Sequence, residues 1–291
     1  MLQRILVPTD GSPESEKAIP IAAQIARAQG AELVVIRAIE PPPWLAAAGP
    51  EPAATDVFEE MIETIQQEAE ESLARIEADL QAQGLRAKAV AIHGSPSAAL
   101  LDYEVAHQTD LLVMATHGRT GLARFTLGSV TDHMVREGQA PVLVVRRSSP
   151  AATTLHRALV TLDGSGLAEE ALPMLEALAG KPLESVVLFR VEADPRDQGP
   201  AMTYLQGVAG RMSSLPVKIE AVVDVGPPTP GIERVALTVD LIIICTHGRG
   251  GLDRLRHGSV AEHVVREIET PALLVRAGTQ GRAPTAPGRL P

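Results

Sequence analysis

Aromatic residues and basic charge are both scarce in this sequence. Aromatic side chains make up only 2% of the 291 residues, so the core must be aliphatic, and a stacking platform for single-stranded nucleic acid is disfavoured. The formal net charge of −10 at pH 7 disfavours non-specific binding to nucleic acid or to an anionic membrane surface. These two absences predict that neither nucleic acid nor a membrane is a partner.

Cysteine and long apolar runs are also lacking. Cys245 is the single cysteine, which excludes an internal disulfide and a metal site made of cysteines alone. No apolar run approaches the ~20 residues that span a bilayer, and Asp10 comes too early for the apolar segment of a signal peptide. We therefore expect a soluble cytoplasmic protein.

What the chain does contain is a long internal repeat. Residues 115–130, ATHGRTGLARFTLGSV, return 130 residues later as residues 245–260, CTHGRGGLDRLRHGSV, without a gap. Each copy follows an apolar run, Leu111–Met114 or Leu241–Ile244. Such a repeat indicates two domains of one fold, and the chain has room for two domains of roughly 100–200 residues.

Short strands alternate with helices in both halves. The expected strands are Arg4–Thr9, Glu32–Ile39, Arg86–Ile92, Asp110–Ala115 and Pro141–Arg146, then Ala158–Leu162, Ser185–Val191, Lys218–Val223, Asp240–Cys245 and Ala272–Arg276. The expected helices run from Ser12-Pro13 to Gly30, near Ser95–His107, near Ser129–Glu137 and over Leu167–Leu178. Continuous Val, Ile and Leu runs are typical of parallel strands buried on both faces, which predicts an α/β fold with right-handed crossovers.

The domain boundaries follow from this order. We expect a first domain at 1–147, a linker at 148–154, a second domain at 155–277 and a disordered tail at 278–291 that is rich in Gly, Pro and Arg. The first domain carries an insert at 41–84, with Pro41-Pro42-Pro43-Trp44 and a long polar helix around Val57–Ala82. The insert can be a lid, a partner surface or padding, and the last two interpretations are favoured.

A carboxylate follows the first strand of each half, as Asp10 and Asp163. At a strand end of a doubly wound fold, such a group can accept hydrogen bonds from ribose hydroxyls or from an exocyclic amine. The Asp-Gly-Ser sequence also favours a turn, so a purely structural cap is the alternative.

Glycines follow the fourth strand of each half, in Gly118-Arg-Thr-Gly121 and Gly248-Arg-Gly-Gly251. Without a Cβ in the way, their backbone N–H groups can approach an anion, although any tight surface loop also needs glycine. If the first and fourth strands are neighbours, Asp10 and residues 118–129 line one crevice, and nucleotide binding is favoured.

A helix start comes next in each half, at Gly128-Ser129-Val130 and Gly258-Ser259-Val260. The free N–H groups and the positive dipole end of a helix suit a phosphate. The alternative is structural: Ser129 with Asp132, and Ser259 with Glu262, match the capping-box pattern.

Three stretches of the first half, with counterparts in the second, carry a family resemblance. They are Ile-Leu-Val-Pro-Thr-Asp-Gly-Ser at 5–12, Gly-x9-Gly-Ser at 118–129 and Gln-Ala-Pro-Val-Leu-Val-Val at 139–145. Over nearly the whole chain except the tail, the sequence resembles tandem universal stress protein domains. The resemblance implies two flavodoxin-like (adenine nucleotide alpha hydrolase-like) domains, each a five-stranded parallel sheet flanked by helices. Many members bind ATP through Gly-x2-Gly-x9-Gly-(Ser/Thr), so ATP, which usually carries Mg²⁺, is the implied cofactor.

The resemblance also implies nucleotide-binding residues. In the first half it places Asp10 at the ribose or adenine, Ala38 beside the base, Gly118, Gly128, Ser129 and Val130 at the phosphates, and Pro8, Met114 and Ala115 around them. The matching positions of the second half are Asp163, Val191, Gly248, Gly258, Ser259 and Val260. The first glycine of the family pattern is Ala115 in one half and Cys245 in the other. Because cysteine is the bulkier replacement, the first half is the better candidate site.

Other side chains of the repeat favour structural interpretations. His117 and His247 each lack a second ligand at metal spacing, and Cys245 fits a buried, unreactive strand end. The arginines of the repeat are equally suited to neutralising phosphate charge and to solvating the surface; they are Arg119, Arg124, Arg249 and Arg254.

Three functions stay open. The favoured one is a non-catalytic, ATP-binding stress-response or regulatory protein; the others are a slow ATPase or phosphotransferase and a nucleotide-free interaction module. No Walker Gly-x4-Gly-Lys-(Ser/Thr) sequence is present, and no evident base stands beside the glycine loop, which disfavours an enzyme. The last strands, Val142–Arg146 and Leu273–Arg276, are edge candidates, and family members pair such edges. We therefore expect the halves to pair within the chain, with a homodimer as a further family-level expectation.

Overall fold

The described chain folds into two halves of matching element order. The computed structural model describes residues 1–40, 52–116, 127–146, 154–246 and 259–278, with the side chains of 52–59 and 259 outside the description. The first half contains β1 (Arg4–Pro8), α1 (Pro13–Glu16), α2 (Ala18–Gln29), β2 (Glu32–Ile39), α4 (Pro52–Ala82), β3 (Ala87–His93), α5 (Pro96–His107), β4 (Leu111–Ala115), α6 (Ser129–Glu137) and β5 (Val142–Val145). The second half contains β6 (Arg157–Thr161), α7 (Gly166–Glu169), α8 (Leu172–Leu178), β7 (Ser185–Glu192), a 3-10 turn (Pro195–Asp197), α9 (Gln198–Arg211), β8 (Lys218–Val225), α10 (Pro228–Ala236), β9 (Leu241–Thr246), α11 (Ser259–Glu267) and β10 (Ala272–Arg276).

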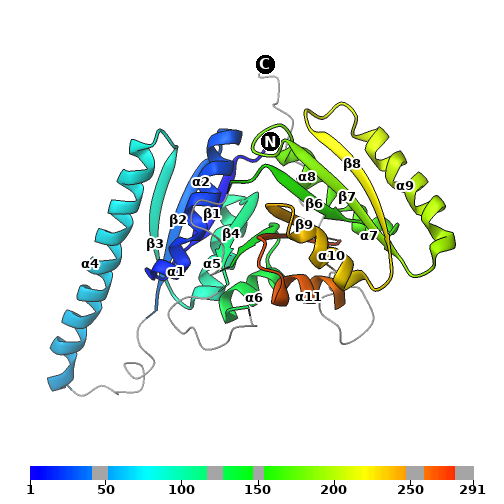
Figure 1. The fold of residues 1–291 in the computed structure, drawn as a ribbon. Coiled ribbons are helices and arrows are strands. Elements are labelled where there is room, and N and C mark those ends of the chain that lie inside the picture. The colour runs from blue at the N-terminus through cyan, green and yellow to red at the C-terminus, as the bar shows by residue number, and fades with distance from the viewer. Residues whose placement is uncertain (41–51, 117–126, 147–153, 247–258, 279–291) are drawn as a thin grey trace.

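All ten described strands form one sheet, in the order β3-β2-β1-β4-β5-β10-β9-β6-β7-β8 (Figure 1). Pairing is parallel within each half, which confirms the predicted α/β class and five-stranded parallel halves. The halves meet where β5 and β10 run antiparallel, with Leu143 opposite Leu273. The predicted pairing of the two last strands within one chain is therefore confirmed.

Two aliphatic clusters fill the two faces of the sheet, and both include residues from both halves. One face, which we call the α2 face, carries α2, α4, α8 and α9; the other, the α6 face, carries α5, α6, α10 and α11 (Figure 1). The halves also touch through side chains, since Gln24 accepts a hydrogen bond from the Leu155 N–H at 3.1 Å. A core that crosses the seam holds the two halves as one unit.

The helix after the first strand is broken in both halves, which corrects the single helix predicted at 167–178 and the single helix predicted from Ser12-Pro13 to Gly30. In the first half α1 ends at Glu16 and α2 starts at Ala18; in the second α7 ends at Glu169 and α8 starts at Leu172. Pro20 and Pro173 lie four residues after those two ends. Because a proline ring clashes with the carbonyl four residues before it, each proline interrupts the helix there.

Helices α9 and α10 have no counterpart among the elements expected from the sequence. Gly199, Gly207 and Gly210 lie inside α9, and α10 begins with Pro-Thr-Pro-Gly. Glycine and proline are the usual signals of loops, although proline is tolerated in a first helical turn. Packing of Leu205 and Val208 into the α2-face cluster overrides the weak local preference of α9.

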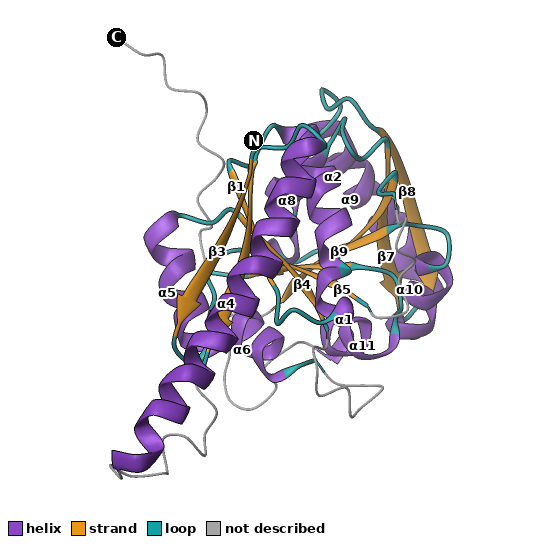
Figure 2. Ribbon diagram, turned by 90° about the vertical axis from the view of Figure 1, so that its left-hand side faces the viewer, coloured by secondary structure: helices purple, strands orange, loops and turns teal. Residues whose placement is uncertain are grey.

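The long polar helix predicted around 57–82 is present as α4, which has 31 residues against 14 in α9. It extends past the sheet at its N-terminal end (Figures 1 and 2) and packs on β3 and β2 through its C-terminal part, where Leu73 and Leu80 are buried.

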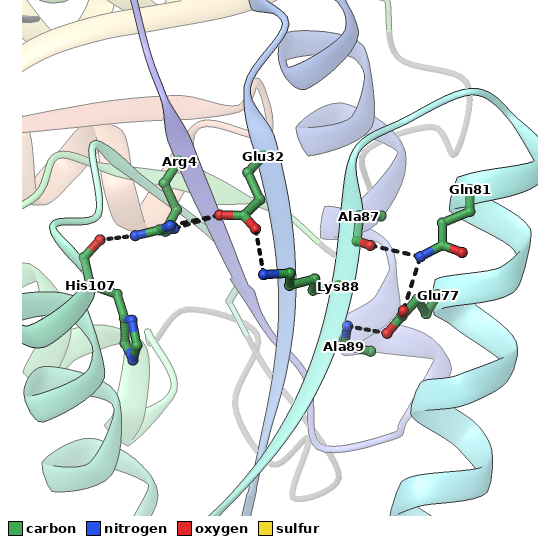
Figure 3. A network of polar contacts seen from close by, with 8 residues as sticks. All are labelled: Arg4, Glu32, Glu77, Gln81, Ala87, Lys88, Ala89 and His107. Carbon is green, nitrogen blue, oxygen red and sulfur yellow. Dashed lines mark hydrogen bonds and ion pairs between the residues drawn. The ribbon is translucent and has the colours of Figure 1, made fainter.

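The outer strand of the first half is covered by two side chains of α4. Glu77 accepts from the Ala89 N–H at 2.7 Å, and Gln81 donates to the Ala87 carbonyl at 3.0 Å (Figure 3). Unpaired N–H and C=O groups on an edge strand are a template for aggregation, so these two bonds protect the edge.

A charged network joins β1, β2 and β3 near their amino-terminal ends. Arg4 binds Glu32 at 2.7 Å and the His107 carbonyl, and Lys88 approaches Glu32 at 3.2 Å (Figure 3). The pKa of Glu32 lies below its ordinary value, chiefly because Arg4 donates a hydrogen bond to the carboxylate. Partial burial opposes this shift, and Lys88 adds to it. The network therefore lies at the other end of the strands from their carboxyl ends.

Several predicted segments lie outside the described residues. They are most of the predicted linker, residues 279–291 of the predicted tail and the Pro-Pro-Pro-Trp stretch of the insert. In the part of the chain that the structure describes, no helix is both long and apolar enough to span a membrane.

Candidate functional site

The first and fourth strands are neighbours in each half, as the crevice hypothesis requires. β1 pairs with β4, and β6 pairs with β9, while β2 and β7 lie on their other sides. The strand order of each half therefore reverses between its first and fourth strands. Open α/β sheets bind ligands beyond the carboxyl ends of the strands at this switch point.

Register brings three predicted site residues onto one face at this edge. Pro8 lies beside Ile36, and Leu6 lies beside Leu112. Because side chains alternate along a strand, Pro8, Ala38 and Met114 all point to the α6 face, where Met114 is buried.

The backbone of Ala38 faces the space beyond the end of β1. The last bond between these strands runs from the Thr9 N–H to the Ile36 carbonyl, at 2.8 Å. In a parallel strand, peptide groups that point to the same neighbour recur every second residue, so those of Ala38 point the same way as those of Ile36. β1 has already ended at Pro8, so an N–H and a C=O of one residue are presented at the sheet edge.

Asp10 sits in a turn that buried hydroxyl groups hold in place. Its Oδ1 accepts from the N–H of Ser12 at 3.0 Å and from the Ser12 hydroxyl at 2.5 Å. Below the turn, the Thr9 and Ser15 hydroxyls are 2.8 Å apart and both residues are buried. The structural cap expected for the Asp-Gly-Ser sequence is therefore present, and the role of Asp10 toward a nucleotide stays a prediction.

The start of α6 is fixed to the end of β4. Gly128 donates to the Thr116 carbonyl at 2.6 Å, and the Thr131 hydroxyl donates to the Ala115 carbonyl at 3.0 Å. These two bonds bring Gly128 and Ser129 next to Ala115.

The capping box expected at Ser129 and Asp132 is wrong. Gly128 is the N-cap of α6, with no side-chain cap, so exposed Ser129 is already the first helical residue and cannot fill that role. Asp132 pairs instead with Arg136, one turn later. The first N–H groups of α6 thus have no side-chain acceptor among the described residues, which leaves them available to an anion.

The second half repeats the turn with fewer polar contacts. Asp163 Oδ1 accepts from the Ser165 N–H at 2.8 Å, but Leu162 and Ala168 replace the buried hydroxyl pair of the first half. Partial burial raises the pKa of Asp163, and the hydroxyl and N–H of Ser165 outweigh it, so the pKa lies below its ordinary value.

Val191 occupies the position of Ala38 and lies close to Gly231 of α10. A Cβ on Gly231 of α10 would lie 3.2 Å from Val191 Cγ2 and 2.9 Å from Asp224 Oδ2. Ser259 and Val260 open α11 as predicted, so Asp163, Val191 and these two residues occupy positions matching those of the first half.

Cys245 lies near the end of β9 but faces the α2 face of the sheet, whereas Pro8, Ala38 and Met114 point to the α6 face. Its side chain is half-buried against the α2-face cluster, while the neighbouring Ile244 belongs to the α6-face cluster. Burial, with smaller contributions from Glu170 and Asp163, raises the pKa of the Cys245 thiol to about 12. This agrees with the prediction of an unreactive strand-end cysteine.

The sequence analysis did not identify Arg37 and Arg190, which lie beside the two Asp-Gly-Ser turns. A Cβ on Gly11 would lie 2.8 Å from Arg37 Nη1, and a Cβ on Gly164 would likewise meet Arg190. Each arginine immediately precedes a predicted base-side residue, Ala38 or Val191, inside an apolar strand. An arginine at the same place in the apolar sequence of β2 and β7 is the signal that could have identified them.

Several predicted site residues fall outside the described part of the chain: Gly118, Gly121, Gly248, Gly251, Gly258, His117, His247, Arg119, Arg124, Arg249 and Arg254. Their roles stay predictions. Among the described residues, no group of three or more His, Cys, Asp or Glu side chains could hold a metal ion.

Both halves of the chain match one family model. The universal stress protein family model matches residues 1–146 and again 154–276. The chain belongs to the universal stress protein family. A universal stress protein of Mycolicibacterium smegmatis is 27% identical over 288 residues, covering 94% of this chain and 96% of that relative. Another, from Methanocaldococcus jannaschii, is 29% identical over 147 residues, covering 50% of this chain and 84% of the relative.

Solved universal stress proteins share the two-half fold. The crystal structure of one from Archaeoglobus fulgidus has a TM-score of 0.74 at 19% identity and covers 94% of this chain and 98% of its own. This likeness supports the flavodoxin-like architecture.

Proposed function

We propose that the first half of this universal stress protein binds ATP without turning it over and acts as a nucleotide-dependent stress-response regulator. The observation that carries the proposal is the extension of β2 past the end of β1, which presents the N–H and C=O of Ala38 at the switch point. Adenine offers an N6 donor beside its N1 acceptor, which complements such a backbone pair. Guanine offers an O6 acceptor beside an N–H donor, so the same pair would be mismatched.

The neighbouring groups suit the rest of the nucleotide. Asp10, in its hydroxyl-braced turn, supplies a carboxylate for ribose hydroxyls. The uncapped start of α6 at Gly128 and Ser129 supplies N–H groups and a positive dipole end for phosphate oxygens. Mg²⁺ enters the proposal only with ATP, whose phosphates usually carry it.

The first experiment identifies the nucleotide and tests turnover. Purified full-length protein is denatured, and the released nucleotide is identified by chromatography; fresh protein is then titrated with ATP and GTP and incubated with ATP and Mg²⁺. We expect ATP to bind, GTP to bind at least about tenfold more weakly because buried polar groups would be left unpaired, and ATP to stay intact. Absence of ATP binding would leave the nucleotide-free interaction module, and multiple turnovers would establish an ATPase.

Gly128→Val tests the phosphate cradle. The φ of −56° and ψ of 150° at Gly128 are open to valine, so the fold should persist. The added side chain would lie where we place the phosphates, and we expect ATP affinity to fall about 100-fold, as several charge-assisted hydrogen bonds are lost.

Gly258→Val is the matched control, because it makes the same change in the second copy of the repeat. We expect it to leave ATP affinity unchanged. Full affinity in Gly128→Val would refute the cradle, and a loss in Gly258→Val alone would assign the site to the second half.

A further inference from the structure

The seam between the halves places an arginine of each half beside the other half. β5 and β10 pair antiparallel, with Leu274 opposite Val142, so the same register sets Arg276 across from Ala140. Arg146 directly follows β5 and Arg276 ends β10, and the two occupy repeated positions in the chain. Both guanidinium groups therefore lie at the turn that leads into the other half's last strand.

The two arginines make reciprocal contacts with helix ends. Arg276 Nη1 donates to the carbonyl of Gly138, the C-cap of α6, at 3.1 Å, and Arg146 Nη2 donates to the carbonyl of Val265, near the end of α11. Carbonyl groups at a helix C-terminus carry partial negative charge, so a guanidinium is well matched to them. Arg276 of the second half thus binds the C-terminal end of α6, and Arg146 of the first half binds α11 near its C-terminal end. The N-terminal ends of these helices begin at Ser129 and Ser259.

In the first half, α6 is fixed at both ends. Its start is held by the Gly128 and Thr131 bonds to the end of β4. At its other end, buried Glu104 accepts from the N–H groups of Gln139, at 2.7 Å, and Ala140, while Arg276 binds the Gly138 carbonyl. A helix of nine residues moves as a short rod, so its C-terminal contacts also set the direction of its first N–H groups.

We propose that Arg276, contributed by the second half, is a positioning residue for the phosphate-binding end of the first-half nucleotide site. This inference rests on the proposed function. Arg276 acts through α6: it fixes the helix against the sheet so that the N–H groups at Ser129 and Val130 face the phosphates. The first-half site is therefore completed by the second half, and the duplication is a functional unit rather than two independent domains.

The test separates phosphate contacts from base and ribose contacts. ATP and adenosine affinities are measured for the full chain and for Arg276→Gln by calorimetric titration. We expect Arg276→Gln to weaken ATP binding about fivefold, the size of effect that a residue outside a site commonly transmits to it, and to leave adenosine binding unchanged. Arg157→Gln is the matched control, because it removes one cation from the second half at an ion pair with Glu220 that lies away from α6.

A second variant and a nucleotide-free readout complete the test. Arg276→Lys keeps the charge but not the planar fork, and we expect about a twofold fall in the ratio of ATP to adenosine affinity. Hydrogen exchange in the absence of nucleotide should be faster at the amides of residues 132–134, the first to donate hydrogen bonds within α6, in Arg276→Gln than in Arg157→Gln.

Each outcome decides the inference. An unchanged affinity ratio in Arg276→Gln overturns it, as does an equal loss of ATP and adenosine binding; if that variant does not fold, an unchanged ratio in Arg276→Lys overturns it. Failure of the unaltered protein to bind ATP refutes the proposed function itself, and the exchange rates at 132–134 then still decide whether Arg276 positions α6.

Discussion

The two halves share every strand pairing but differ in the polar contacts around their strand ends. Both have an Asp-Gly-Ser turn with glycine at positive φ and an arginine above it. Only the first half adds the buried pair of Thr9 and Ser15 below the turn, and only the first half anchors its Gly-Ser helix through a threonine hydroxyl, since Ala261 replaces Thr131. The apolar repeat preserves the fold in both halves, whereas the Thr9–Ser15 and Thr131 bonds belong to the first half alone, because Leu162, Ala168 and Ala261 carry no hydroxyl.

The two outer strands of the sheet, β3 and β8, are protected in different ways. Glu77 and Gln81 of α4 bond to the backbone of β3, while exposed Lys218 and Glu220 place charge on β8. Covering an edge and charging it are two solutions to the same aggregation hazard. The C-terminal part of α4 therefore protects the edge of β3, whereas β8 carries charged side chains of its own.

The largest expected effect comes from Glu104, a carboxylate that the second half does not repeat, since Arg234 stands 130 residues later. Glu104→Ala would leave the buried N–H of Ala140 and the partly buried N–H of Gln139 without their acceptor. We expect the free energy of unfolding to fall by about 2–4 kcal/mol, measured by urea denaturation. Thr270→Val, which removes the bond to the Ala236 carbonyl in the second half, should cost about 1 kcal/mol; equal costs would contradict the asymmetry.

Glu104 also predicts a pH dependence. Burial raises its pKa above the ordinary value of 4.5, against the opposing N–H groups of Ala140 and Gln139 and the charge of Arg276. The native state therefore holds a proton that the unfolded chain has released, so this contribution is complete below pH 4.5 and is lost as pH rises through the raised pKa. Glu104→Gln keeps an acceptor and cannot titrate, so its stability should lack this fall; identical pH profiles for both proteins would refute the assignment.

An intermediate effect tests what the halves share. Gly11 and Gly164 have φ values of 80° and 87°, which side-chain-bearing residues rarely adopt. Gly11→Ala and Gly164→Ala should each lower the free energy of unfolding by about 1–2 kcal/mol because of backbone strain. We expect ATP affinity to fall only in Gly11→Ala. A large difference between the two stability losses would show that the turns are not equivalent.

The smallest effect sharpens the difference at the helix start. Thr131→Val keeps the side-chain shape but removes the donor to the Ala115 carbonyl, and should cost about 1 kcal/mol of unfolding free energy. ATP affinity should fall about threefold, equivalent to less than 1 kcal/mol, because Gly128 is still held by Thr116. Thr131→Ser retains the hydroxyl as the control, and a loss in this variant as large as in Thr131→Val would point to packing instead.

Local patterns predicted most of the strands, because a buried parallel strand is a short apolar run with clear ends. The bounds of β2 and β10 match those predicted, as do those of α6. The errors arose where two local rules competed. Ser129 fits a capping-box pattern, but Gly128 takes the cap position instead. Gly-rich α9 lacks a local helix signal and depends on packing against the sheet.

The sequence by itself determined the duplication, the parallel α/β class, the Asp-Gly-Ser turns and the helix starts, because each depends on residues near one another in the chain. Only the tertiary structure decided the antiparallel register of β5 and β10, the position of the Ala38 backbone past the end of β1, and the bond from Arg276 to Gly138. These contacts join residues far apart in the chain, and their register is set by how whole apolar faces pack. A sequence repeat therefore predicts two copies of a fold, but the arginines that join the copies are identified only from the assembled sheet.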